Sequence, residues 1–276
     1  MAHALLGTEQ VTLHEMVVGS GPVEAVFLHG LFGQGKNFGT VAARLGDVAT
    51  CHLVDLPNHG RSAWTEEFTL DGQAEVVADW LSHRFDGPVA LIGHSLGGKV
   101  AMRLALSRGE LVDRLMVLDI SPARNVAAAT FVNLVAALRT LDMDALTSRA
   151  QADEELAELI PDVVVRRFLL QNLRHKGAHW SWQANLDLLG DSLHTVGGWP
   201  AIDATFDGPV LWVNGGRSPY VLPEHLEPMR RLFPRVLQLT LKRAGHWVHS
   251  DDPDGFVTVV RHFLTDYGDA GSAQRD

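Results

Sequence analysis

Residues 93–97 constrain the fold of this chain more than any other stretch. They read Gly-His-Ser-Leu-Gly, follow a wholly apolar run at residues 88–92, and precede a helical pattern at residues 100–106. A short apolar run followed by a helix predicts a buried parallel strand that enters a crossover helix. A Gly-x-Ser-x-Gly turn at such a junction predicts a nucleophile elbow, because the small flanking residues let the chain turn sharply and direct the Ser95 side chain outward.

Strands and helices alternate on both sides of this turn, and the alternation predicts an α/β fold with a mostly parallel sheet covered by helices on both faces. The apolar and polar residues at 10–17 alternate as in an edge strand with one solvated face. Further strands are predicted at 23–28, 49–56, 88–92, 115–119, 208–214 and 236–241. Helices are predicted at 37–45, 70–85, 224–232 and 256–264, and the small, polar tail at 268–276 is expected to fray.

The alternation stops between residues 123 and 207, where helical patterns follow one another. They cover residues 127–141, 145–150, 154–160, 163–173 and 185–189. A helical insertion between two strands of a parallel sheet predicts a cap over the strand ends, where open α/β folds bind their ligands. We therefore predict an α/β core of residues 1–122 and 208–276, with a helical cap of residues 123–207 inserted in it.

Composition excludes several classes of function. Hydrophobic residues make up 46% of the chain and charged residues 20%, as in globular proteins. The net charge of −10, with no cluster of Lys and Arg along the sequence, argues against nucleic-acid and anionic-membrane partners. Cys51 is the only cysteine, which rules out an intrachain disulfide. The start of the chain lacks the pattern of a secretory signal and no apolar run approaches the ~20 residues of a membrane span, so we expect a cytoplasmic protein.

A nucleophilic serine needs a base to take its proton, and the base in turn needs an acid. In the fold expected for this elbow, the acid and then a histidine follow the serine along the chain. His246 lies directly after the last predicted strand, in a loop that can return an imidazole to Ser95. We predict His246 as the base.

Five short motifs together resemble the α/β-hydrolase superfamily, and specifically its small serine esterases. They are His-Gly at 29–30, Asp-Leu-Pro-Asn-His-Gly-Arg-Ser at 55–62, Gly-His-Ser-Leu-Gly-Gly-Lys at 93–99, Asp-Ile-Ser-Pro at 119–122, and Gly-His-Trp at 245–247. The motifs extend over most of the chain. The resemblance implies a small-molecule ester substrate and no cofactor, and it carries no prediction of oligomeric state.

The acid of the triad departs from the usual pattern of this superfamily. Most members carry an Asp in the turn after the strand that follows the cap, but here that turn, residues 215–220, has Ser218 in its place. A hydroxyl cannot stabilise an imidazolium as a carboxylate does. Some esterases of the family resemble this chain in having the acid after the strand that follows the elbow, which is the position of Asp119. We predict Asp119 as the acid and Ser218 as an auxiliary hydrogen-bond partner; the alternative for Asp119 is a turn cap near Ser121.

Position and resemblance also imply the remaining parts of the site. The backbone N–H groups of Leu96 and Leu31 are predicted to form the oxyanion hole. Apolar side chains of the oxyanion loop and the cap are predicted to bind a small to medium apolar acyl group, with internal packing of the cap as the alternative role. The candidates are Phe32, Phe131, Leu134 and Trp182, with Leu138, Phe168 and Trp180 as further choices. His29, Asn58 and His59 are expected to brace loops.

Other functional motifs fit less well. Residues 30–36 match the spacing of a phosphate-binding loop, but Asn37 replaces the Ser or Thr that would hold Mg²⁺. Residues 93–98 lack the middle glycine of a dinucleotide fingerprint. The pairs His246/His249 and His175/His179 have ligand spacing without the acidic neighbour of a zinc motif, so no metal site is predicted.

The sequence therefore predicts acyl transfer to Ser95, with His246 as base and then acid, followed by attack of water. Ser at the elbow argues against the dehalogenases and epoxide hydrolases of this superfamily, which use a carboxylate nucleophile. Carbon-carbon bond hydrolases, thioesterases, amidases and cofactor-free haloperoxidases share the same triad and remain alternatives. A non-catalytic receptor on the same fold is the alternative from another class.

Overall fold

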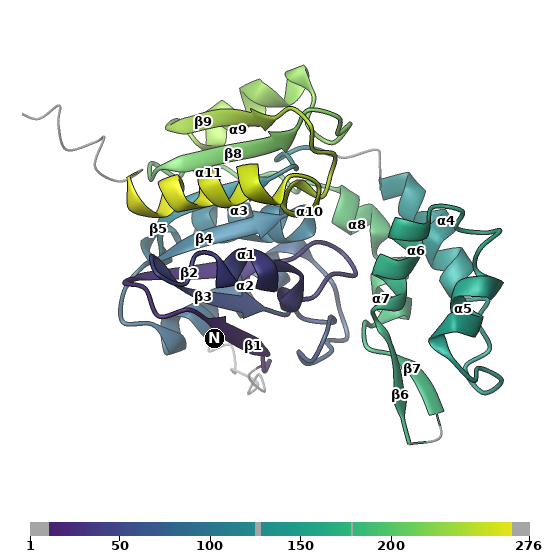
Figure 1. The fold of residues 1–276 in the computed structure, drawn as a ribbon. Helices are drawn as coiled ribbons and strands as arrows, with labels where there is room; N and C mark the ends of the chain where they lie inside the picture. Colours follow the sequence, from purple (N-terminus) through teal and green to yellow (C-terminus); the bar gives the residue numbers. More distant parts are fainter. Residues whose placement is uncertain (1–10, 125–127, 178, 267–276) are drawn as a thin grey trace, which may run out of the picture.

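A mostly parallel sheet forms the centre of the molecule, as predicted (Figure 1). The computed structural model describes residues 11–124, 128–177 and 179–266, and in these residues the sheet has seven strands in the order β1-β3-β2-β4-β5-β8-β9. Only β1 runs antiparallel to its neighbour. The strands are β1 (Glu15–Val18), β2 (Val23–Leu28), β3 (Ala49–Val54), β4 (Val89–His94), β5 (Val112–Leu118), β8 (Val210–Gly215) and β9 (Val236–Leu241).

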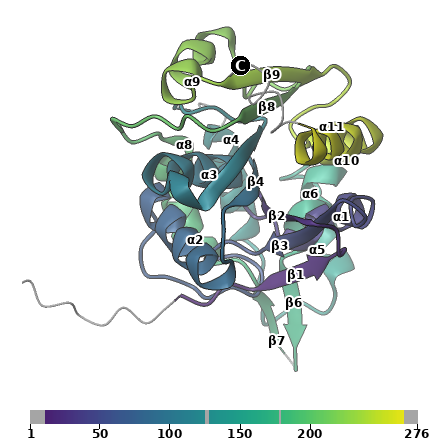
Figure 2. The ribbon, with the colours of Figure 1, turned by 90° about the vertical axis from the view of Figure 1, so that its left-hand side faces the viewer.

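Helices cover both faces of the sheet, which explains why its central strands are apolar throughout (Figure 2). In β2, Val26 and Leu28 belong to the cluster that packs under α2 (Leu70–Arg84) and α3 (Leu96–Ser107). Ala25 and Phe27 belong to the cluster on the opposite face, under α1 (Gly39–Ala43) and α11 (Pro253–Thr265). Successive side chains of a strand point to opposite faces, so one apolar run supplies two cores.

The remaining elements of the core are short. A 3-10 turn, η1 (Gly35–Phe38), precedes α1, and η2 (Gly109–Leu111) precedes β5. After β8 the chain forms η3 (Pro223–His225) and α9 (Leu226–Leu232), and α10 (Val248–Asp251) precedes α11. None of the described helices is long and apolar enough to cross a bilayer.

The first strand is shorter than predicted. Residue 10, where the predicted strand begins, lies outside the described residues, and β1 starts only at Glu15. The residues before it bond to a loop instead of a strand: Thr12 O accepts from Ala63 N–H at 3.0 Å, and His14 O accepts from Asp55 N–H at 2.9 Å. These backbone groups are satisfied by the loop after β3, so no ladder forms there. The predicted tail at 268–276 also lies outside the described residues.

The chain between β5 and β8, which we call the cap segment, lies beside the sheet at the end where β4 meets α3 (Figure 1). Its helices are α4 (Ala128–Leu138), α5 (Arg149–Glu155), α6 (Val163–Leu170), α7 (Leu186–Asp191) and α8 (Leu193–Gly197). The division into core and cap at residues 122 and 208 stays a prediction, and residue 127, where its first helix is predicted to begin, is outside the described residues.

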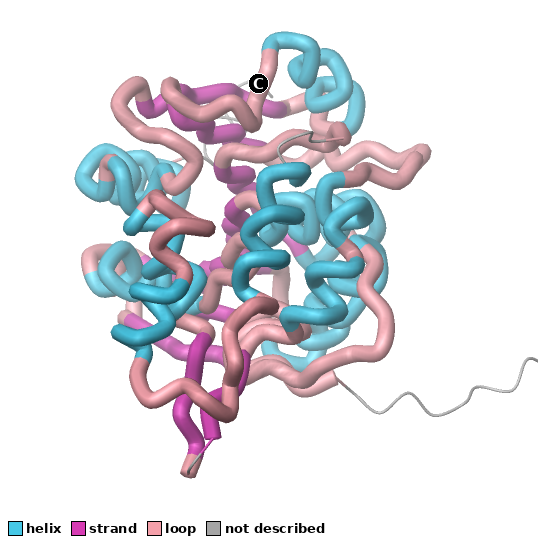
Figure 3. Tube along the Cα trace, turned by 90° about the vertical axis from the view of Figure 1, so that its right-hand side faces the viewer, coloured by secondary structure: helices cyan, strands magenta, loops and turns pink. Residues whose placement is uncertain are grey.

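The purely helical prediction for the cap segment is wrong in three places. The helix predicted at 163–173 ends at Leu170, and an antiparallel hairpin of β6 (Leu173–Lys176) and β7 (His179–Trp182) follows (Figure 3). Gly177 turns the hairpin with a φ of 67°, which glycine adopts without strain, and β7 alternates exposed and half-buried residues as a strand does. The helices predicted at 145–150 and 154–160 are replaced by the single helix α5, which begins after its N-cap Ser148. Beyond the predicted helix at 185–189, the additional helix α8 follows.

Candidate active site

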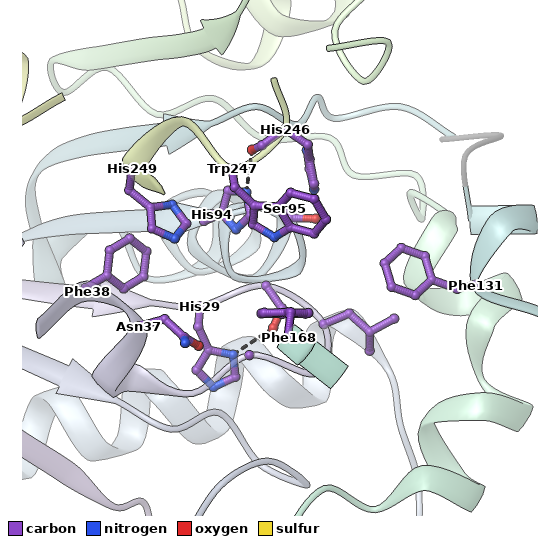
Figure 4. Close-up of a pocket in the computed structure, with 13 residues that line it drawn as sticks. His29, Asn37, Phe38, His94, Ser95, Phe131, Phe168, His246, Trp247 and His249 are labelled. Carbon is purple, nitrogen blue, oxygen red and sulfur yellow. Dashed lines mark hydrogen bonds between the residues drawn. The ribbon is translucent and has the colours of Figure 1, made fainter. Parts of the chain in front are cut away.

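Ser95 lies in the sharp turn between β4 and α3 (Figure 4). Its φ of 52° and ψ of −116° lie outside the regions that side chains other than glycine prefer. A Cβ at Gly93 would lie 2.3 Å from Gly97 O, and a Cβ at Gly97 would lie 2.4 Å from Leu28 O. Only glycine fits at these two positions, which is the physical reason for the Gly-x-Ser-x-Gly pattern.

Asp119 lies directly after β5 and is fully buried. Its Oδ2 accepts a hydrogen bond from His246 Nδ1 at 2.7 Å and another from the Ser218 hydroxyl. Its Oδ1 accepts from Gly215 N–H at 2.9 Å. The structure thus brings together the predicted acid, the predicted base and Ser218. Because β5, β8 and β9 are parallel neighbours, the loops at their carboxyl ends meet at one edge of the sheet.

The protonation of His246 follows from this contact. Nδ1 must donate its proton to the buried carboxylate, which leaves Nε2 as an acceptor. His246 and Ser95 line the same cleft (Figure 4). No hydrogen bond joins Ser95 Oγ to His246 Nε2 within the described part of the chain, and in enzymes without substrate such catalytic contacts are commonly long.

Two further residues hold His246, and sequence reasoning gave neither a role. The ring of Tyr220 stacks on the imidazole, with ring centroids 3.7 Å apart and planes inclined by 16°. His94 Nε2 donates to the backbone oxygen of His246 at 2.9 Å. Burial, together with the neighbouring His246 and His249, lowers the pKa of His94 well below its ordinary value, so this imidazole is neutral. His94 falls within the motif at 93–99 that resembles esterases, whereas Tyr220 lies in the turn at 215–220 that departs from the family pattern.

Two backbone donors point to the region of Ser95. Neither Leu31 N–H nor Leu96 N–H donates to an atom in the described ranges, and Leu96 is the first residue of α3, where helical N–H groups have no partner. The loop that carries Leu31 comes close to the serine: a Cβ at Gly30 would lie 3.2 Å from Ser95 Cβ. His29 braces this loop, since its Nδ1 donates to Gly30 O at 2.8 Å and its Nε2 accepts from Leu56 N–H at 3.0 Å.

Ser95 lines two recesses. The first encloses about 400 Å³, partly open to solvent, and is lined by aromatic residues that include Phe131, Phe168 and Trp247. The second, of about 360 Å³, also contains Ser95 and Phe131, and it extends toward Ile120, Leu193 and Tyr220. The mostly apolar walls of both recesses suit an apolar ester.

A model of the α/β hydrolase fold family matches residues 26–253. The chain belongs to the α/β-hydrolase family. This α/β-hydrolase is 37% identical over 245 residues to an sn-1-specific diacylglycerol lipase of Mus musculus, with 87% of this chain and 80% of the relative covered. It is 30% identical over 241 residues to an esterase of Escherichia coli, with 87% of this chain and 92% of the relative covered.

Solved structures agree with this assignment. The structure of an esterase from a marine microorganism superimposes on this α/β-hydrolase with a TM-score of 0.89 at 28% identity, covering 92% of this chain and 99% of that one. The membership in the esterase branch that the sequence motifs predicted is therefore confirmed.

The apolar side chains predicted to bind substrate divide into two groups in this α/β-hydrolase. Phe131 lines both recesses beside Ser95. Phe32 is buried behind Phe131, with ring centroids 6.3 Å apart, while Leu134 and Trp182 pack against the apolar core. These three residues line neither recess. A role for these three residues in substrate binding stays a prediction, because a helical pattern identifies an apolar face without telling whether that face meets a ligand or a neighbouring helix.

No group of three His, Cys, Asp or Glu residues in the described ranges of this α/β-hydrolase is arranged to hold a metal ion. Of the two histidine pairs with ligand spacing, His246 bonds to Asp119, and His249 packs against the Phe38 ring at 4.7 Å. His175 lies against Trp180 in the hairpin.

Proposed function

We propose that this α/β-hydrolase is a serine esterase that cleaves carboxylic esters with small to medium apolar acyl groups through an acyl-enzyme. The observation that carries the proposal is the pairing of buried Asp119 with His246 in the cleft that Ser95 lines. The names of its relatives, esterase and diacylglycerol lipase, support ester bonds as the substrate class.

In the first half of the reaction, His246 Nε2 takes the proton of the Ser95 hydroxyl as the oxygen attacks the carbonyl carbon of the ester. Asp119 keeps the imidazole in the tautomer with a free Nε2 and stabilises the imidazolium that forms. Hydrogen bonds from Ser218 and Gly215 N–H hold the carboxylate in position for this task. The imidazolium then donates its proton to the leaving alcohol.

The negative charge that develops on the carbonyl oxygen needs donors that are in place beforehand. The unpaired N–H groups of Leu31 and Leu96 suit this role, and one such donor is worth about 10²–10³ in kcat. In the second half of the reaction, His246 takes a proton from water as its oxygen attacks the acyl-enzyme. The imidazolium then returns the proton to Ser95 Oγ as the bond to the acyl group breaks and the acid leaves.

The two recesses suggest how the ester is seated. Acyl and alcohol groups lie on opposite sides of the carbonyl carbon, and Ser95 lines two apolar recesses, one for each group. Phe131, which belongs to the cap segment and lines both recesses, would then contact both groups of the ester.

The experiment measures release of p-nitrophenol from p-nitrophenyl esters from acetate to octanoate at neutral pH. Ser95→Ala should lower kcat by several orders of magnitude, since a hydroxyl nucleophile is lost. Ser82→Ala is the matched control, because its hydroxyl lies on the exposed side of α2 and bonds only to Asp79 O. A fluorophosphonate probe should label the wild type and Ser82→Ala but leave Ser95→Ala unlabelled. An unlabelled and inactive wild type would instead favour a ligand-binding receptor.

A further inference from the structure

Four cationic side chains from distant parts of the sequence meet beside β1. Lys36 follows β2, Arg61 follows β3, Arg149 is the first residue of α5, and Arg174 lies in β6. Lys36, Arg61 and Arg174 line a recess of about 690 Å³ that is partly open to solvent. Arg149 joins them, because its Nη2 donates to the backbone oxygen of Leu173 at 2.7 Å, next to Arg174. The sequence shows no such cluster; the fold assembles it.

These cations lack carboxylate partners. None of the four forms an ion pair within the ranges that the structure describes. Asp55 faces the recess, but its two carboxylate oxygens accept from the backbone N–H groups of Gly35 and Arg61, and one of them also lies 3.2 Å from His14 Nδ1.

The second carboxylate at the recess is already neutralised. Glu15 lines it too, yet its oxygens bond to His52 and Arg84, at 2.9 Å each. The cluster therefore has an excess of positive charge in a chain whose net charge is −10.

The cations disfavour one another's charged form. Partial burial, and after it the neighbouring Arg174, lowers the pKa of Lys36, against which Asp55 raises it. Burial, and after it Arg149 and Arg61, lowers the pKa of Arg174. With 33 acidic residues against 23 basic ones, the chain has carboxylates to spare for pairing. Cations that remain unpaired around a recess indicate a site for an anion that comes from outside.

We propose that this recess binds a small soluble molecule with two or more negative charges of the phosphate type, such as a phosphate ester or a diphosphate. Guanidinium groups match phosphate oxygens with paired hydrogen bonds, and Lys36 adds a point charge. Gln183, which also lines the recess, has a buried amide oxygen that finds no hydrogen-bond partner among the described residues, and it is available to a hydroxyl of the ligand. A concave site of this volume suits a small molecule. A membrane surface would instead need cations on a protruding face.

The site also joins two parts of the chain. Lys36 and Arg61 belong to loops of the sheet, whereas Arg149 and Arg174 belong to the cap segment. A bound dianion would bridge cations of both parts at once and fix the hairpin against the sheet. The protein should therefore be more stable with the anion than without it, because a ligand that binds only the folded state shifts unfolding by mass action.

The test is thermal unfolding of the full chain over a series of sodium pyrophosphate concentrations at neutral pH, against sodium chloride of matched ionic strength. We expect Tm to rise with pyrophosphate in a saturable manner and to rise less in chloride. The double variant Arg61→Gln/Arg174→Gln should lose the difference between the two salts, and its Kd for pyrophosphate by calorimetry should be weaker by about tenfold or more. Arg230→Gln, which removes one exposed charge on α9, should respond as the wild type does.

Three outcomes would overturn the proposal. If Tm rises equally in the two salts, the cause is general screening of charges by salt and not binding at the recess. If the double variant keeps the difference between the two salts, pyrophosphate binds elsewhere on the protein. Sedimentation with vesicles that contain a phosphatidylglycerol fraction, without a specific pyrophosphate response, would assign the cations to a lipid surface. If the double variant does not fold, Lys36→Met, at an exposed side chain, gives the same comparison, and retention of the wild-type Kd in that variant would count against the site.

Discussion

The imidazole of His246 donates to the carboxylate of Asp119 at 2.7 Å, although 127 residues separate the two in the sequence. The contact depends on the order of strands, because β5 and β9 flank β8 and end at the same edge of the sheet. The turn after β8, which carries the acid in most relatives of this superfamily, here supplies Ser218 to the carboxylate that β5 provides. Four predictions follow from this arrangement and from the packing around it.

Asp119→Asn should lower kcat for p-nitrophenyl esters by about 10⁴ while KM changes little. The amide cannot hold the His246 tautomer or stabilise the imidazolium. The competing role for Asp119, a structural turn cap, forecasts a loss of stability with activity retained in the folded fraction. Circular dichroism of the variant, together with kinetics normalised to folded protein, separates the two. A kcat of the variant close to that of the wild type would show that Asp119 is not the acid of the triad.

Ser218→Ala should lower kcat less than Asp119→Asn does. The hydroxyl donates to Asp119 Oδ2 but does not touch the reacting atoms, so the loss is that of a hydrogen bond to a charged group, about 1.5–3 kcal/mol, or roughly 10- to 100-fold in kcat. Ser218→Thr keeps the hydroxyl and should restore part of the rate. The measurement is kcat and KM of both variants, normalised to the folded fraction by circular dichroism, because a positioning role lowers kcat while KM changes little. A kcat equal to that of the wild type in Ser218→Ala would show that the hydroxyl has no part in positioning the pair.

Much of the site could be predicted because its residues follow strands. Ser95, Asp119 and His246 each come after an apolar run that is recognisable as a strand, and parallel strands bring their carboxyl ends together. The backbone donors could be placed by the same logic. The glycines at 93 and 97 are dictated by backbone contacts so close that no other residue fits.

The parts of the site that could not be predicted depend on which neighbour the apolar face of a helix contacts in the folded protein. The pattern of α4 marks both Phe131 and Leu134 as apolar, yet only Phe131 reaches the recesses, because the helix phase and its packing partners decide which way each side chain points. The hairpin of β6 and β7 lies almost entirely between the helices predicted at 163–173 and 185–189, where no element was predicted. The cations at residues 36, 61, 149 and 174 meet only through tertiary structure. Neighbouring members of the set lie at least 25 positions apart in the sequence, so no local pattern contains two of them.

Gly97→Ala should destabilise the protein by about 1–3 kcal/mol or more, since a Cβ would lie 2.4 Å from Leu28 O, a backbone atom that cannot move freely. Gly87→Ala is the matched control. A Cβ there has no atom within 4 Å, so its effect on the free energy of unfolding should stay within about 1 kcal/mol. Urea denaturation of the three proteins gives the comparison. Equal stabilities would mean that the turn between β4 and α3 yields more readily than its contacts imply.

Lys99 should make the stability of the protein depend on pH. Its buried ammonium donates to the backbone oxygens of Val196, Gly197 and Gly198 at the end of α8, and burial lowers its pKa to about 7. An unfolded lysine keeps its proton up to its ordinary pKa of 10.5, so between these two values the unfolded state binds more protons than the folded state. The free energy of unfolding must then rise with pH over this range, and below about pH 7 the cost of burying the charge is present in full.

Lys99→Met removes the titrating group. The quantity to compare between the two proteins is therefore the slope of the free energy of unfolding against pH, not its value at one pH. Urea denaturation at a series of values from about pH 6 to about pH 9 should show the wild type gaining stability relative to Lys99→Met as pH rises. Met keeps the length and the apolar part of the side chain, which limits the change in packing. The other groups that titrate in this range are common to both proteins and cancel in the difference. Parallel curves would mean that Lys99 stays protonated in the folded protein, held by the three carbonyl oxygens of α8.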